Sequence, residues 1–241
     1  MLDEAVEEFY DTAKKYCSKN GSHDSILGWG DEKTCLSIFS RGINTNNRYC
    51  FLEMGYRVPT DKEKFKTRRV DAFIMERSKS KTLTGIIEAK KVNIDIVEKI
   101  TEGKINQIKR QLEKIESQLS DIDQDVVYSS EEKGVKSHSY RIGLIFIVLR
   151  ARFAKSGKGK KIIWYDFKDI KLRVNKLSDA IDDLIEGDHI ASYYPYIYSD
   201  EQFNLIKDYY GTTLEDEDIK IDRPHSHTYY EVGSKVIAAI F

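Results

Sequence analysis

Two segments within the first forty residues place apolar and polar positions with the spacing of amphipathic helices. A helix over residues 2–16 would present one apolar face, made of Leu2, Val6, Phe9, Ala13 and Tyr16. Asp31 has the side chain of an N-cap and predicts a second helix over residues 32–40. The segment RYCFLEMG, residues 48–55, suits either helix or strand, and Gly55, interpreted as a helix stop, favours a helix.

Three strand-like segments and a long helix are predicted next. The strands are the short run Tyr56–Pro59, the partly β-branched run 68–75 and the run 83–92. The polar residues 76–81 (ERSKSK) between the last two predict a hairpin turn. Residues 94–120 carry the clearest helical pattern of the chain, one apolar stripe formed by Ile105, Ile108, Leu112, Ile115 and Leu119.

The remaining pattern predicts two more strands and two more helices. A strongly apolar strand covers 140–149, and a second strand covers 161–167 after the loop KSGKGKK. The helices are expected at 178–186, capped by Ser178, and at 200–210. The last segment, residues 228–241, could be strand or helix. The fold class is therefore α/β, a mixed sheet flanked by helices, with a core over residues 1–170 and a helical and aromatic C-terminal extension over 171–241 for substrate recognition or dimerisation.

Composition limits where nucleic acid could bind. The 241 residues are 33% charged and 40% hydrophobic, with a formal net charge of −1, so any nucleic-acid site must come from local clusters of Lys and Arg. Two basic runs qualify, residues 62–69 (KEKFKTRR) and 155–161 (KSGKGKK). Each run could equally be a solvated loop.

Cysteine usage and hydropathy favour a cytoplasmic protein. Three cysteines, an odd number, match neither a disulfide framework nor a metal motif. The acidic N-terminal segment lacks a secretory apolar region. The longest apolar run, residues 142–149 with one glycine, is too short to cross a membrane and is typical of a buried strand. We therefore expect no membrane association.

The chemistry-bearing residues lie in the two runs predicted to form a hairpin. Side chains alternate along a strand, so Glu88 and Lys90 share one face of the segment GIIEAKKV. If the runs 68–75 and 83–92 pair, Asp71 can face the same side. Two repelling carboxylates favour a divalent cation between them, and hard oxygen ligands suit Mg²⁺. A neighbouring lysine can orient or help deprotonate an attacking water.

This arrangement resembles the PD-(D/E)xK motif of the restriction-endonuclease-like nuclease superfamily. Asp71, a gap and then Glu88-Ala89-Lys90 match the pattern, with Val70 where the family name has Pro. The resemblance covers about residues 30–150. It implies a core of one helix, three antiparallel strands, a second helix and a further strand. It also implies that Asp71, Glu88 and the carbonyl of Ala89 bind Mg²⁺, with Mn²⁺ as a substitute, and that Lys90 serves the water.

Further candidates come from the helices on either side of the motif. Glu32 shares a helical face with apolar residues and should point inward, as a further acid of the site, or it serves only the helix dipole. Glu53 is the reserve for this role, and Glu8 ranks below it. On the helix after the motif, Gln107 and Lys104 could reach a scissile phosphate. Some relatives carry the motif Gln-x-x-x-Tyr on this helix. Here Gln107 matches the glutamine, but Gln111 stands where the motif has tyrosine.

The expected function is hydrolysis of phosphodiester bonds in DNA by an Mg²⁺-dependent endonuclease. The nucleic-acid backbone would be contacted by basic side chains from both runs and from the helix after the motif: Lys66, Arg68, Arg69, Lys104, Lys158, Lys160 and Lys161. Two alternatives stay open, an RNA-cleaving enzyme on the same core and a binding or interaction module with a relict site. A homodimer would suit cleavage of both strands of a duplex, and the sequence leaves this open.

Overall fold

The computed structural model describes residues 1–19, 31–44, 47–59, 65–77, 81–96, 102–120, 122, 136–152, 154–156, 161–163, 166–185, 187, 189–205 and 229–241. Within these ranges the elements, in chain order, are α1 (Leu2–Lys19), α3 (Glu32–Ile43), β1 (Arg48–Pro59), β2 (Phe65–Arg77), β3 (Lys81–Asp95), α4 (Glu102–Ser120), β4 (Lys136–Arg152), β5 (Ala154–Ser156), β6 (Lys161–Ile163), α5 (Phe167–Leu184), β7 (Ile190–Ser192), β8 (Tyr196–Ile197) and β9 (Tyr229–Ile240).

A mixed, seven-stranded sheet forms the centre of the molecule. Its strand order is β1-β2-β3-β4-β9-β7, and β8 also pairs with β9. The strands β1, β2 and β3 form an antiparallel meander, β4 is parallel to β3, and β9 is antiparallel to β4. Parallel neighbours require a crossover connection, and α4 lies within the connection from β3 to β4. The expected α/β class with a mixed sheet is confirmed.

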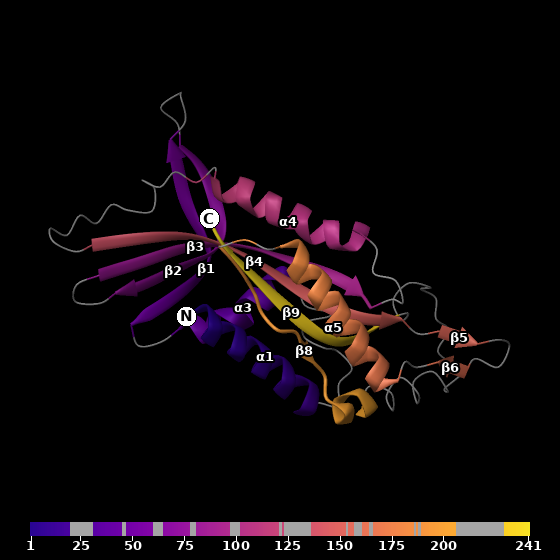
Figure 1. Cartoon of the computed structure of the whole chain (residues 1–241). Coiled ribbons are helices and arrows are strands. Elements are labelled where there is room, and N and C mark those ends of the chain that lie inside the picture. Colours follow the sequence, from indigo (N-terminus) through magenta and orange to yellow (C-terminus); the bar gives the residue numbers. More distant parts are fainter. Residues whose placement is uncertain are drawn as a thin grey trace.

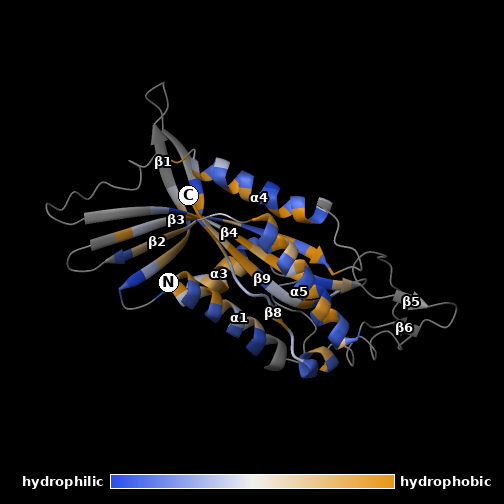
Figure 2. Cartoon of the chain, in the orientation of Figure 1, coloured by the Kyte–Doolittle hydropathy of each residue, from blue (hydrophilic) through white to orange (hydrophobic). Residues whose placement is uncertain are grey.

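Helices cover both faces of this sheet (Figure 1). The strand β4 is apolar on both sides and separates two clusters of buried side chains. Its residues Leu144 and Phe146 pack with α1 and α3, whereas Ile145 and Ile147 pack with α4 and α5. Hydrophobic residues accordingly concentrate in the central strands and on the inner sides of the helices (Figure 2). Of the apolar stripe predicted on α4, all but Ile105 are buried.

The helix expected at residues 48–55 is wrong, because this segment is the first part of β1. The strand pairs with β2 from Arg48 opposite Glu76 to Pro59 opposite Phe65, and the side chains of Arg48 and Glu76 form an ion pair of 2.9 Å. Gly55 continues the strand instead of ending a helix. Pairing with β2, whose Glu76 is 28 residues from Arg48 in the sequence, thus decided a segment whose local pattern suits both states.

The C-terminal predictions also need correction. The helix expected at 178–186 begins earlier, as α5, with Asp166 capping it by accepting from the amide of Lys168. The strand expected at 161–167 shortens to β6. Residues 200–205 are helical, and the rest of the helix expected there lies outside the described residues.

The last segment of the chain is a strand in the middle of the sheet. Along most of β4, β9 forms an antiparallel ladder, and residue 170 falls inside α5, which belongs to the same core. The C-terminal part therefore completes the sheet, which differs from the expected extension appended after residue 170. None of the helices in the described ranges is both long and apolar enough to cross a membrane.

A close contact between α1 and α3 provides a test of this packing. A Cβ added to Gly42 in α3 would lie 2.5 Å from the Cα of Ala5 and 2.8 Å from the carbonyl oxygen of Glu4. These backbone atoms cannot move without separating the helices. We expect Gly42→Ala to lower the free energy of unfolding by roughly 1–3 kcal/mol, the cost of an overpacked core, although alanine favours helices.

The matched control is Gly103→Ala in the first turn of α4, where an added Cβ meets nothing within 4 Å. This variant should be as stable as the native chain or more stable by about 0.5–1 kcal/mol. Urea unfolding followed by circular dichroism measures both changes. Equal effects of the two substitutions would contradict the close contact between α1 and α3.

Candidate active site

The site lies where β2 separates from β3. Among the described residues of these two strands, the ladder runs from Arg77 opposite Thr82 to Ala72 opposite Ile87 and ends there. In contrast, β2 stays paired with β1 to Phe65, and β3 stays paired with β4 to Asp95. The outer half of the β1–β2 hairpin consequently projects away from the sheet (Figure 1). The edge of β3 from Glu88 onward faces this gap.

Along this edge, two carboxylates accept backbone hydrogen bonds that a paired strand would otherwise accept. An Oδ2 atom of Asp71, on β2, accepts from the amide of Ala89 at 2.8 Å. The Oε2 atom of Glu32, in the first turn of α3, accepts from the amide of Lys91 at 3.3 Å. Successive amides on one edge of a strand point the same way every second residue, so the two carboxylates lie side by side in the gap.

The ammonium group of Lys90 lies among the oxygen atoms of the gap. Its Nζ donates to the carbonyl oxygen of Ala89 at 2.6 Å and to Oε1 of Glu32 at 3.4 Å. It is also 4.0 Å from Oδ2 of Asp71. The lysine side chain is partly buried. Oxygen atoms from three different elements thus converge on one cation.

Glu88 adds a further carboxylate beneath this group. Its side chain is 5% exposed. The pKa of Glu88 is raised to about 8, chiefly by burial and then by the negative charge of Asp71 and a hydrogen bond between the two side chains, whereas Lys90 opposes the shift. The pKa of Glu32 is raised as well, first by burial and then by Asp71, whereas Lys90 opposes the shift. The site therefore holds more negative charge than one lysine balances.

A glycine on the neighbouring strand, opposite Glu88, leaves space for two apolar side chains. Gly143 on β4 stands opposite Glu88. A Cβ at Gly143 would lie 2.6 Å from Cγ2 of Ile115, on α4, and 2.9 Å from the ring of Phe241. These two side chains occupy the space that a larger residue at position 143 would need.

The oxygen donors of the gap fit a hard divalent cation. Asp71, Glu88 and the carbonyl of Ala89 supply the oxygen-only ligand set that Mg²⁺ prefers, and Lys90 shows that a cation is stabilised at this carbonyl. Among the described residues no group of three or more His, Cys, Asp or Glu side chains is arranged to hold a metal ion. The set formed here has two carboxylates and a backbone oxygen, and would leave its other positions to water and substrate.

The other acids considered from the sequence interact with residues other than Lys90 in the described part of the chain, although Glu53 lines the same cavity as Glu32 and Asp71. Glu53 is on β1 with a φ of 54°, a left-handed conformation that is uncommon outside glycine, and it forms an ion pair with Lys33 on α3. Glu8 accepts a hydrogen bond from Thr12 within α1. Of the three candidates, Glu32 is the acid that the fold brings to Lys90.

The α4 candidates lie toward the far end of β3. The Nζ atom of Lys104 donates to the carbonyl oxygen of Asp95 at 3.1 Å, five residues beyond Lys90. Gln107 is exposed, and within the described part of the chain it makes no hydrogen bond to the carboxylates. Gln111 is half-buried on the same helix, one turn before Ile115, which lies against Gly143 opposite Glu88. Position along the helix therefore brings Gln111 nearer to the motif than Gln107.

The basic candidates fall mostly in places where side chains are not described. Arg69 is exposed on the outer half of β2, and its charge acts on Lys33 and Glu53. Lys66 and Arg68 belong to the same part of β2, and Lys161 begins β6, but their side chains lie outside the described part. Lys158 and Lys160 lie outside the described residues altogether.

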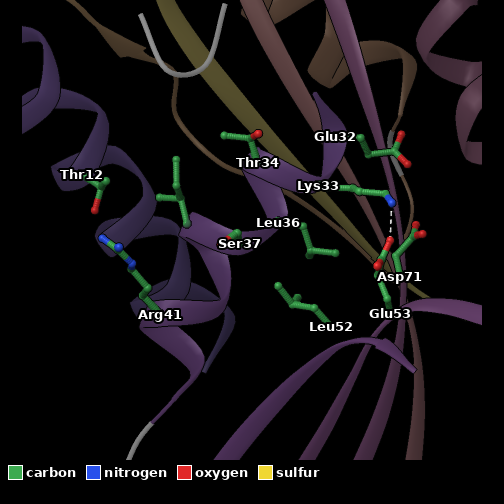
Figure 3. A pocket seen from close by; sticks show the side chains of 11 residues that line it. Thr12, Glu32, Lys33, Thr34, Leu36, Ser37, Arg41, Leu52, Glu53 and Asp71 are labelled. Carbon is green, nitrogen blue, oxygen red and sulfur yellow. Dashed lines mark ion pairs between the residues drawn. The ribbon is translucent and has the colours of Figure 1, made fainter. Parts of the chain in front are cut away.

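A cavity of about 670 Å³ extends from this site along α3. Glu32 and Asp71 lie at one end, and Arg41 and Thr12 at the other (Figure 3). The apolar part of its wall includes Leu52 of β1. Sequence reasoning missed this cavity. The signal that was available is a row of polar side chains at every fourth position of α3, Lys33, Ser37 and Arg41.

Comparison of the chain with protein-family models, with curated proteins and with solved structures finds no match. Any functional conclusion therefore depends on the site itself.

The raised pKa of Glu88 predicts how stability depends on pH without added metal. A carboxyl whose pKa is 4.5 when unfolded and about 8 when folded favours the folded state only while it is protonated. The native chain should therefore lose stability as pH rises from 4.5 to 8. Glu88→Gln cannot ionise, so its melting temperature should exceed that of the native chain by a margin that grows across this window.

The control is Glu113→Gln on the exposed side of α4, which should follow the native curve. Thermal melts in EDTA between pH 5 and pH 8.5 measure all three proteins. A constant difference between Glu88→Gln and the native chain over this range would contradict the shifted pKa.

Proposed function

We propose that the chain is a metal-dependent nuclease that hydrolyses phosphodiester bonds in DNA, with Asp71, Glu88 and Lys90 at its catalytic centre and Glu32 beside them. One observation carries the proposal. Three carboxylates, a backbone carbonyl and an ammonium group converge where β2 leaves β3. Repelling charges held together at the cost of burial are typical of catalytic sites and rare in purely structural positions.

The order of the elements supports the restriction-endonuclease-like core that we propose for the fold. The helix α3 is followed by three antiparallel strands, the helix α4 and the strand β4 parallel to β3. This is the order that the motif resemblance implies. The acids also lie on the elements expected of that core, Glu32 on the first helix, Asp71 on the second strand and Glu88 on the third.

Each side chain has a role that its position allows. Asp71 and Glu88, with the carbonyl of Ala89, would hold Mg²⁺ or Mn²⁺. A bound Mg²⁺ would stabilise charge on the scissile phosphate and lower the pKa of a coordinated water. Lys90 Nζ would donate a hydrogen bond to the attacking water or to the phosphate. Glu32 Oε1, which accepts from Lys90, would hold this ammonium group in the gap.

Substitutions at the motif test this assignment. Asp71→Asn and Glu88→Gln keep the shape of each side chain and remove its charge, so they should lower plasmid cleavage by at least ~100-fold, the order expected when charge stabilisation by a metal is lost. Lys90→Met should lower cleavage by ~10²–10⁴-fold, the range for a positioned proton donor or acceptor.

Metal binding separates the roles within this set. Calorimetric titration with Mn²⁺ should show weaker binding for the Asp71 and Glu88 variants and nearly native binding for Lys90→Met. Glu113→Gln is the control for both assays. Mn²⁺ binding to Asp71→Asn at native affinity would contradict the ligand assignment.

The cleavage assay also tests which nucleic acid is the substrate. Plasmid, linear duplex, single-stranded DNA and RNA are incubated with Mg²⁺, Mn²⁺ or EDTA. We expect cleavage of DNA that EDTA abolishes. Cleavage of RNA alone would replace DNA by RNA in the proposal, and binding without cleavage of any substrate would favour a relict site.

A paired comparison tests Glu32 against Glu53. Glu32→Gln should reduce the cleavage rate by about tenfold or more with little change in melting temperature, because it removes the charge that holds Lys90 Nζ. Glu53→Gln loses only an exposed pair with Lys33, so its rate should be native. A native rate for Glu32→Gln, with a slow Glu53→Gln, would move the acid to β1.

A further inference from the structure

The cavity along α3 is continuous with the catalytic carboxylates, yet the roles assigned above leave it unused. Its lining runs from Glu32 and Asp71 to Arg41 (Figure 3). Arg41 comes nine positions after Glu32 on α3, a distance of roughly 13 Å along the axis at the rise of an α-helix. A nucleotide joined to a phosphate held at Asp71 can therefore reach into this cavity.

The cavity offers both a cation and an apolar wall. Arg41 is exposed in the last turn of α3 and, among the described residues, has no ion pair. An arginine guanidinium matches the geometry of a phosphate group. By contrast, Lys33 at the other end is already neutralised by Glu53. The wall is formed by Leu36, Ile38 and Leu52.

Leu52 is 40% exposed although it is a large apolar side chain. It projects from β1 toward α3 across the cavity (Figure 3). An apolar side chain left exposed inside a cavity is a surface for the face of an aromatic ligand, and every nucleobase has such a face.

The size of the cavity limits what it can take. A volume of about 670 Å³ is in the range of sites that enclose one small molecule. A base pair still within a duplex cannot enter a space of this size, whereas a single base that is unpaired or turned out of its stack can.

We propose that this cavity binds an unpaired nucleotide of the strand that is cleaved, with its base against Leu52 and a neighbouring phosphate at Arg41. The inference rests on the proposed nuclease function and narrows its substrate to nucleic acid with a single-stranded or displaced nucleotide beside the scissile phosphate. Arg41 and Leu52 are thus substrate-binding residues of the site.

The test measures binding of 5′-phosphorylated dithymidylate to the full chain in EDTA, where no cleavage occurs. Ser37→Trp places a large side chain in the cavity from an exposed position on α3. Arg41→Ala removes the guanidinium. Calorimetry should show binding to the native chain, and each substitution should raise the dissociation constant by about tenfold or more.

Two substitutions on α4 serve as matched controls. Ser117→Trp changes an exposed helical serine whose carbonyl accepts from Ser120, just as the carbonyl of Ser37 accepts from Ser40. Arg110→Ala removes an exposed arginine from the same helix. Both variants should bind the dinucleotide as the native chain does.

The possible results separate this inference from the nuclease proposal. Native affinity in both Ser37→Trp and Arg41→Ala, equal losses in the α4 controls, or no binding to the native chain would each overturn the cavity assignment, whatever the cleavage assay shows. Selective loss of binding in the two α3 variants supports it. If no DNA or RNA substrate is cleaved while this selective loss is present, the nuclease proposal fails and the nucleotide site stands.

Discussion

The separation of β2 from β3 at Asp71 is the constraint on which the site depends. A strand edge inside a sheet normally finds its hydrogen-bond partners on the next strand. Here the ladder stops at Ala72 and Ile87, and carboxylates accept from the amides of Ala89 and Lys91 instead. The same gap leaves the carbonyl of Ala89 pointing at a cation. The interrupted pairing thus brings the acceptors for two strand amides and the oxygen atoms that we propose as metal ligands to one place, and it leaves them open to a substrate.

The gap concentrates negative charge that the fold alone does not favour. Burial and the neighbouring negative charge of Asp71 raise the pKa of Glu88 to about 8. Lys90 offsets part of this repulsion by contacting Glu32 and Ala89. A group of acids with one lysine is less stable without a further cation than with one. The repulsion among these acids and the affinity for a divalent ion that we propose for the site therefore have the same origin.

The rest of the molecule holds the two sides of the gap in place. The strand β4 pairs with β3 along fifteen residues and with β9 on its other side, so β3 cannot follow β2 when the strands diverge. Behind this, Lys235 on β9 is almost fully buried and donates to Ser178 and Asp182 of α5, which fastens that helix to the sheet. The contact of α1 with α3 at Gly42 similarly determines where Glu32 lies.

By itself the sequence determined the elements whose apolar patterns are long and regular, among them α1, α4, β3 and β4, and the α/β class that follows from them. It also determined that Glu88 and Lys90 share a strand face, since alternation along a strand is local. It could not determine the state of residues 48–55, the position of β9 in the sheet or the choice between Glu32 and Glu53. Each of these depends on partners distant in the chain, Glu76 for β1, Ile145 for β9 and Lys90 for Glu32. Only the tertiary structure brings such partners together, because their attraction acts over ångströms in space and leaves no periodic trace along the chain.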